Sequence, residues 1–159
     1  MGMGRMGQIF SNSFKIAKGS ATLAQAIAAA TDLPASGSYV NVAGYERVHI
    51  IAALGVLHTS DSPTLEPKCS DAVGGTADSI DATNLLHTPD VDGDDEEFVT
   101  WTIEVAKLPV DHHFLLVDIA GTTTNGSYGF IFFLLEGLDL PVTQTTAVLP
   151  TASQYAHVG

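Results

Sequence analysis

Apolar and polar residues alternate most clearly in "EFVTWTIEVA", residues 97–106. Successive side chains of a β-strand point to opposite faces of its sheet, so this pattern predicts a strand with one buried face. The buried face is expected to carry Val99, Trp101, Ile103 and Val105, and the other face Phe98, Thr100, Thr102 and Glu104.

Other segments of the chain also have the period of strands. "SYVNVAGYERVHIIAALGVLH", residues 38–58, predicts two strands around Gly44, and the second is so apolar that we expect both of its faces to be covered. "PTLEPKCSDAV" and "DSIDATNLLHT" are weaker strand candidates, separated by a turn at "GGTAD". "HHFLLVDIAG" and "SYGFIFFLLEGL" predict a late hairpin, because the Asn125-Gly126 pair between them suits a tight turn.

The first part of the chain has a different pattern. Residues 1–14 are rich in glycine and methionine and predict an extended arm. Ser20 can cap a short helix over residues 21–31, with Leu23 and Ile27 on its packing side. Pro34 disfavours helix at the residue before it and should end this element.

Seven or eight strands separated by turns, without helices between them, predict a mainly β protein. The expected fold is an antiparallel β-sandwich or jelly roll with an extended N-terminal arm and one short helix. We place the arm and the helix in residues 1–37, the β-sandwich domain in residues 38–140 and a C-terminal tail in residues 141–159.

Composition limits the possible partners. The chain of 159 residues has a net charge of -12, so a nucleic-acid partner is not expected. The longest apolar runs fall far short of the roughly 20 residues of a membrane span, so we expect no membrane insertion. Cys69 is the only cysteine and cannot form an intrachain disulfide.

An acidic stretch, "TPDVDGDDEEFVTW", covers residues 88–101. Its glycine comes too early for a calcium loop of the EF-hand kind, and it precedes a strand where such a loop would precede a helix. We interpret it as a solvated loop whose charges oppose edge-to-edge association, and we expect no metal or cofactor. Weak calcium binding is the alternative, with Asp90, Asp92 and Asp94 as candidate ligands.

Catalytic patterns are not found in the sequence. His112 and His113 are adjacent, so on a strand they would point to opposite faces and could not share a metal ion. There is no Gly-x-Ser-x-Gly elbow, no phosphate loop and no dinucleotide fingerprint. We therefore do not expect an enzyme.

The order of segments resembles that of small head proteins of tailed bacteriophages that decorate or cement the capsid. The resemblance covers about residues 39–105. Its first part is a Gly-Tyr-x-Arg-Val start before an apolar strand that ends in glycine, and its second part is an Asp-x-x-Gly-Thr-like turn. The matching residues are Gly44, Tyr45, Arg47, Val48 and Gly55, followed by Asp71, Gly74, Gly75 and Thr76.

This resemblance implies a structural virion protein on the capsid exterior that binds the major capsid protein and stabilises the phage head. We expect a homo-oligomer, a dimer or a trimer. The predicted partner-binding residues lie in the arm: Met3, Met6, Ile9, Phe10 and Phe14. The alternatives are a head-tail joining or tail subunit, and a secreted glycan-binding jelly roll with calcium in the acidic loop.

Overall fold

The computed structural model describes residues 14–21, 25–27, 31–55, 57–80, 85–89, 96–122 and 128–137. These residues form strands and a single 3-10 turn. The strands are β1 (Phe14–Lys18), β2 (Gln25–Ala26), β3 (Thr31–Leu33), β4 (Val40–Asn41), β5 (Tyr45–Leu54), β6 (Ser62–Ser70), β7 (Asp78–Ser79), β8 (Phe98–Glu104), β9 (Phe114–Thr122) and β10 (Tyr128–Gly137). The 3-10 turn η1 (Val105–Lys107) follows β8. None of the described residues belongs to a helix with the length and hydropathy of a membrane span.

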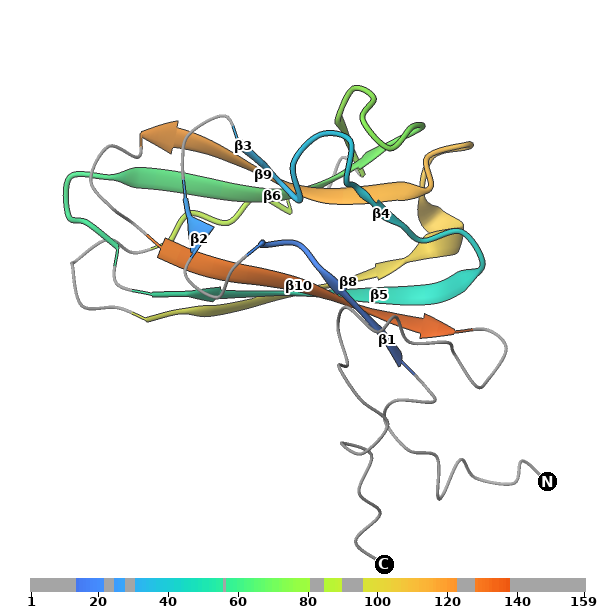
Figure 1. The fold of residues 1–159 in the computed structure, drawn as a ribbon, viewed down its shortest axis with the longest axis horizontal. Coiled ribbons are helices and arrows are strands. Elements are labelled where there is room, and N and C mark those ends of the chain that lie inside the picture. Colours follow the sequence, from blue (N-terminus) through green and yellow to red (C-terminus); the bar gives the residue numbers. More distant parts are fainter. Residues whose placement is uncertain are drawn as a thin grey trace, which may run out of the picture.

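Two antiparallel sheets form the two layers of the molecule (Figure 1). In the first, called sheet A, the strand order is β1-β10-β5-β8, and β2 also pairs with β10. In the second, sheet B, the order is β3-β9-β6-β7, and β4 also pairs with β9. The mainly β, antiparallel sandwich expected from the sequence is therefore confirmed.

Strand pairing is nested along the chain. The first strand, β1, pairs with the last, β10. Toward the middle of the chain, β3 pairs with β9, β5 with β8 and β6 with β7. Successive pairs alternate between sheet A and sheet B. A long antiparallel hairpin of this kind, wrapped into two sheets, is the jelly roll. Of the two expected architectures, the structure has this one.

The core lies between the two sheets and is built from alternate residues of each long strand. In β5, for example, Val48, Ile50 and Ala52 are fully buried, whereas the residues between them are only half-buried. Strand β8 has the predicted orientation: Trp101 is 9% exposed and Ile103 is 5% exposed. Val99 and Val105 pack against the same core but stay partly exposed. Val105 does so from η1, after β8 has ended.

The predicted helix over residues 21–31 is wrong. Within that range the structure has β2, which pairs with β10, and the start of β3, which pairs with β9. Ser20 is not a helix cap, because its buried Oγ accepts a hydrogen bond from the backbone N–H of Ile131 at 2.8 Å. Pairing with strands from the far end of the chain outweighs the helix propensity of the alanines. Strands β1, β2 and β3 thus pair at the edges of the two sheets.

The predicted late hairpin is also wrong. Strands β9 and β10 follow each other in the chain, but β9 lies in sheet B between β3 and β6, and β10 lies in sheet A between β1 and β5. The chain therefore changes sheet between them. A turn signal such as Asn125-Gly126 acts locally and does not determine which strand becomes the neighbour.

One open side of the sandwich, between β8 and β6, is occupied by residues 85–89. The backbone of His87 exchanges two hydrogen bonds of 2.8 Å with Leu65 in β6. The His87 ring lies 2.7 Å from a carboxylate oxygen of Glu97, next to the start of β8. The segment is thus connected to both sheets.

Candidate functional site

The outer face of sheet A, which points away from sheet B, carries a group of apolar side chains among polar ones such as Lys18, His49, Thr100 and Thr102. Residues that lie directly opposite each other in an antiparallel ladder share a face, so the register assigns this face residue by residue. Phe132 lies beside Ile51, Phe130 beside Ala53, and Ala53 beside Phe98. We call the following set the apolar face: Phe14, Ile16, Ile51, Ala53, Phe98, Phe130, Phe132 and Leu134.

Exposure differs across the apolar face. Phe98, in the edge strand β8, is 78% exposed, and the other seven residues are half-buried. The rings of Phe130 and Phe132 stack with centroids 5.6 Å apart. The ring of Phe14 meets the edge of His49 at 6.0 Å. These contacts order the side chains along the sheet.

A row that is mainly charged crosses one end of the sheet and includes Phe14, which lies opposite Glu136. Arg47 Nε lies 3.3 Å from Glu136 Oε2, and a second nitrogen of the same guanidinium lies 3.1 Å from Glu46. The hydrogen bond that Arg47 donates to Glu46, and then the charge of Glu136, raise the pKa of Arg47. Glu104, opposite Arg47 in the ladder, completes the row on β8. The charges lie in a line across the strands, at the end where β1 begins and β10 ends.

The outer face of sheet B is polar. Lys68 in β6 pairs with Asp118 in β9 and lies 3.6 Å from Glu66. The hydrogen bond with Asp118 raises the pKa of Lys68. In the neighbouring β3, Asp32 accepts a hydrogen bond from the hydroxyl of Tyr39, whose pKa is raised by burial and then by this carboxylate. The two outer faces of the sandwich therefore differ in chemistry.

The outer side of sheet B is partly covered by loops of the same chain. The backbone N–H groups of Gly37 and Tyr39 donate hydrogen bonds of 3.0 and 3.4 Å to the carbonyl of Val73, in the loop after β6. This connection joins segments on the two sides of β9. Leu116, which lies beside the outer-face residue Lys68, is fully buried. Among the described strands, by contrast, none packs as a further layer on the outer side of sheet A (Figure 1).

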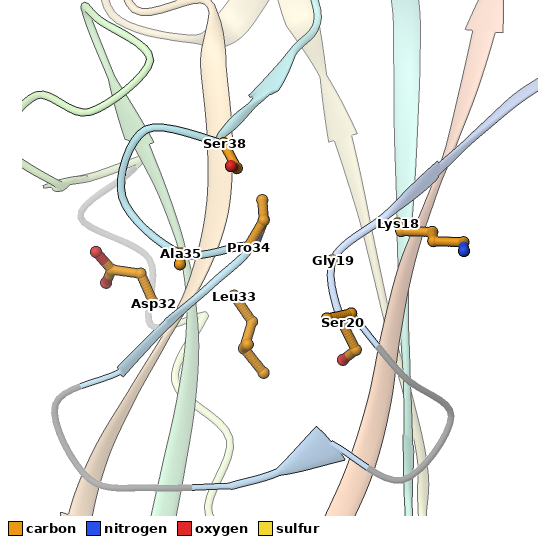
Figure 2. Close-up of a pocket in the computed structure, with 9 residues that line it drawn as sticks. Lys18, Gly19, Ser20, Asp32, Leu33, Pro34, Ala35 and Ser38 are labelled. Carbon is orange, nitrogen blue, oxygen red and sulfur yellow. The ribbon is translucent and has the colours of Figure 1, made fainter. Parts of the chain in front are cut away.

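A hollow of about 410 Å³ opens between the edges of the two sheets, opposite to the side occupied by residues 85–89. It is lined by residues 18–21 from one sheet, and by residues 32–35 and Ser38 from the other (Figure 2). The side chains of Lys18 and Asp32 point away from it in this view. The backbone N–H groups of Gly19 and Ser20 both donate to the carbonyl of Ile131. The hollow thus has mainly apolar walls, and its buried polar groups already have partners.

The site residues expected from the sequence are only partly within the described residues. Met3, Met6, Ile9 and Phe10 lie outside them, as do the calcium candidates Asp90, Asp92 and Asp94. Phe14 is described: it is the first residue of β1 and belongs to the apolar face. The last residue of the predicted arm is therefore part of a strand of sheet A.

The histidines are dispersed. His49 contacts Thr102, His87 contacts Glu97, and His112 contacts Asp78. His112 and His113 precede β9 and do not lie on the strand. Within the described ranges, histidines, cysteines and acidic residues form no group of three or more that could hold a metal ion.

Sequence reasoning missed the apolar face as a unit. Its signal was present in the nearly continuous apolar run of β10, since a strand with one solvated face should alternate. What the sequence did not show was the register that sets Phe132 beside Ile51 and brings β1 and β8 to the two sides of the same face.

Comparisons with known proteins do not assign the chain to a family. No family model matches the chain, and no curated protein matches it. Among solved structures, a chain from the disulfide-linked pili that form Bacillus endospore appendages has 18% sequence identity and a TM-score of 0.41. The match covers 81% of this chain and 94% of that chain. A likeness at this level carries no argument about function.

Proposed function

We propose that this chain is a structural virion protein, located on the capsid exterior, that binds the major capsid protein and stabilises the phage head. The observation that carries the proposal is the apolar face of sheet A. Its residue Phe98 is exposed and the other members are half-buried. Apolar side chains on the outer side of a sheet supply contacts with other proteins, and structural subunits complete their burial in such contacts.

The jelly-roll fold limits the classes of protein that we consider for this chain. The same architecture is used by viral capsid proteins, by lectins and by cupins. Lectin and cupin sites need aromatic platforms or metal ligands grouped at one place. The apolar face instead supplies half-buried aliphatic and aromatic side chains along four strands. This chemistry suits a protein partner.

Two features of the sequence support the same proposal. Glycines that match capsid decoration proteins fall at turns or loops: Gly44 has a φ of +82° before β5, and Gly74 and Gly75 lie in the loop between β6 and β7. The predicted arm, residues 1–14, ends with Phe14, the first residue of β1 in sheet A. Its residues Met3, Met6, Ile9 and Phe10 are proposed to contact the capsid.

The test is co-sedimentation of the purified chain with phage heads from which it has been removed. We expect the full chain to sediment with the heads. A variant that lacks residues 1–13 should stay folded, because β1 begins at Phe14, but should attach at least tenfold more weakly. Circular dichroism and the fluorescence of Trp101 report on its fold.

A matched control replaces Met3, Met6, Ile9 and Phe10 by serine and keeps the length of the chain. It should lose attachment to the same extent. If the full chain does not sediment with the heads at any concentration, the proposed function is wrong. Undiminished attachment of the truncated chain would remove the arm from the contact.

A further inference from the structure

We propose that the free edge of β8 pairs in antiparallel fashion with β8 of a second copy of this chain, so that the two A sheets become one continuous sheet across a two-fold axis. The interface is an edge of the sandwich, and the outer faces of the two layers take no part in it. The inference goes beyond the proposed function and shares with it only the view that the chain is a structural subunit.

The backbone of β8 has one side without a partner strand. β8 ends the strand order of sheet A, and β5 is the described strand that pairs with it. The backbone N–H of Leu54 donates to the carbonyl of Glu97 at 2.8 Å, which fixes the phase of this ladder. Because bonded pairs alternate in an antiparallel ladder, the backbone groups of alternate residues point away from β5. These outward residues of β8 are all exposed: Phe98, Thr100, Thr102 and Glu104.

Other parts of the sandwich do not use this edge. Residues 85–89 form hydrogen bonds with the backbone of Leu65 in β6, the indole of Trp101 and the carboxylate of Glu97. Only the first of these groups is backbone, and it belongs to sheet B. Among the described residues, no hydrogen bond reaches the outward backbone groups of β8. A further strand can therefore pair there.

The neighbouring strand of sheet B is protected against such pairing, whereas β8 is not. In β6 the N–H of Leu65 points away from β9, since it bonds to the carbonyl of His87. Pro63 and Pro67 have the same phase as Leu65, so each puts a proline ring where an outward N–H would lie. Prolines, bulges and charged side chains are the usual devices that keep an edge strand from pairing. β8 has no proline, and its register with β5 is continuous from Phe98 to Glu104.

The composition of β8 also suits pairing. Its sequence FVTWTIE consists of β-branched and aromatic residues as far as Glu104. Glu104 is the single charge of the strand, and its carboxylate lies 3.0 Å from Lys107. Three uncharged outward residues thus precede one charge that already has a partner. An exposed edge strand of this kind is a template for another strand.

A second β8 fits this edge because the strand is complementary to itself. With the two-fold axis at Trp101, Thr100 lies opposite Thr102 of the second copy, and Phe98 lies opposite Glu104 of the second copy. All four outward residues then take part, with two hydrogen bonds in each of four pairs, about eight in all. Threonine pairs are favourable across strands, and no like charges come opposite each other. A different protein would need an unpaired strand of its own, whereas each copy of this chain brings one.

Other registers are less favourable. A shift that sets Thr100 opposite itself also sets Glu96 opposite Glu104 of the second copy, and like charges repel. A shift that sets Thr102 opposite itself moves Phe98 past the end of the second strand, because η1 begins at Val105. A shift by one residue sets outward backbone groups against inward ones. The charges and the ends of β8 therefore select the axis at Trp101.

The test is light scattering after size-exclusion chromatography, over protein concentrations from about 5 to 500 µM. The wild-type chain should change from monomer to dimer, with a dissociation constant on the order of 10–100 µM. Thr100→Pro removes an outward N–H and puts a ring between the two strands, so it should weaken the dimer at least tenfold. The matched control is Thr100→Val, which keeps the backbone donor and the branched shape and should leave the dimer in place. Circular dichroism and the fluorescence of Trp101 check that both variants fold.

Hydrogen exchange gives a readout that needs no substitution. In the wild-type chain, the amides of Thr100 and Thr102 should exchange about three- to tenfold more slowly at 500 µM than at 5 µM, because only the dimer protects them. The amides of Val99 and Trp101 point toward β5 and should exchange at the same rate at both concentrations. Mass spectrometry with fragmentation resolves these neighbouring positions. This measurement decides on its own if the proline variant does not fold.

Four results would overturn the pairing of β8. The wild-type chain stays monomeric at 500 µM, or Thr100→Pro folds and leaves the dimer intact. Slow exchange of Thr100 and Thr102 that is equal at both concentrations would assign the edge to a segment of the same chain. Protection that appears only when phage heads are added would assign it to a capsid segment. A monomer that still sediments with heads contradicts the pairing alone, and a dimer that does not sediment contradicts the proposed function alone.

Discussion

The indole Nε1 of Trp101 donates a hydrogen bond to the backbone carbonyl of Leu85 at 2.9 Å. Trp101 lies in β8 at the edge of sheet A, and Leu85 begins the segment that closes the side of the sandwich between β8 and β6. One side chain thus fills the core and also fixes the backbone of the segment beside it. This bond, together with the pair of His87 and Glu97, holds residues 85–89 in place.

Replacing Trp101 by phenylalanine should test this double role. The Trp101→Phe variant loses the N–H donor and part of the buried ring, and we expect it to reduce the free energy of unfolding by about 1–3 kcal/mol. Urea unfolding followed by circular dichroism measures the change. Phe98→Leu, on the same strand but 78% exposed, should lower the free energy of unfolding by less than about 0.5 kcal/mol. Equal losses in the two variants would show that Trp101 does not hold the segment.

Gly121 and Gly44 both have a positive φ, but an added side chain would clash with a neighbouring atom only at Gly121. Gly121 has a φ of +90°, and a Cβ added there would lie 2.0 Å from the carbonyl oxygen of Ser62. Gly44 has a φ of +82°, but no atom lies within 4 Å of the same position. Gly44→Ala should therefore cost only about 1 kcal/mol for the left-handed conformation. Gly121→Ala should cost at least about 3 kcal/mol, because the backbone of β6 must also move.

The same urea measurements compare these two alanine variants with the wild-type chain. A loss in Gly121→Ala no larger than that in Gly44→Ala would mean that β6 and β9 separate easily at Ser62. In that case the ladder between them would not be rigid at this end.

The thiol of Cys69 should be inert in the folded protein. It is fully buried in β6, and burial, followed by the charge of Asp78, raises its pKa to about 11. The thiolate is the reactive form, so a thiol reagent at pH 8 should modify the chain only when the sandwich opens. Labelling with Ellman's reagent, with and without urea, measures this. Fast labelling of the native chain would contradict the buried position.

The His112 ring should remain protonated to a higher pH than an ordinary histidine. A hydrogen bond with the carbonyl of Val110, and then one with Asp78, raise its pKa above 6.5. A raised pKa in the folded state stabilises the protein below the unfolded value, and this contribution is lost as the pH rises through the folded pKa. Asp78→Asn should bring the pKa of His112 down.

NMR titration of the ring protons measures the pKa directly. Glu104→Gln, a change of one charge on the surface of another strand, is the control and should leave the pKa of His112 in place. An unchanged pKa in Asp78→Asn would assign the whole effect to the carbonyl of Val110.

Sequence alone was sufficient for the fold class and for the faces of single strands. Alternation around Trp101 gave the correct buried face of β8, because a period of two reports directly on burial. It failed for residues 21–31, where alanine favours helix but β2 pairs with β10 and β3 with β9. It failed again at β9 and β10, since a turn sequence does not specify the sheet to which the next strand belongs.

The apolar face was harder to predict for a related reason. Each of its strands is recognisable in the sequence, but Phe14, Ile51 and Phe132 are distant along the chain, and only the register of two ladders brings them together. The mainly charged row at the end of the sheet depends on the same register. The buried face of a single strand can be predicted from its residues. A surface built by several strands can be predicted only when the order of those strands in the sheet is known.

The nested pairing of strands also decides when the protein can fold during its synthesis. β10, at residues 128–137, lies between β1 and β5 at the centre of sheet A, so a nascent chain cannot complete that sheet until this strand has left the ribosome. Contacts between residues this far apart in sequence form slowly. Until then the apolar side chains of β5 remain open to other nascent chains on the same messenger RNA. Expression at low temperature or with a chaperone that holds such strands should therefore raise the yield of soluble protein.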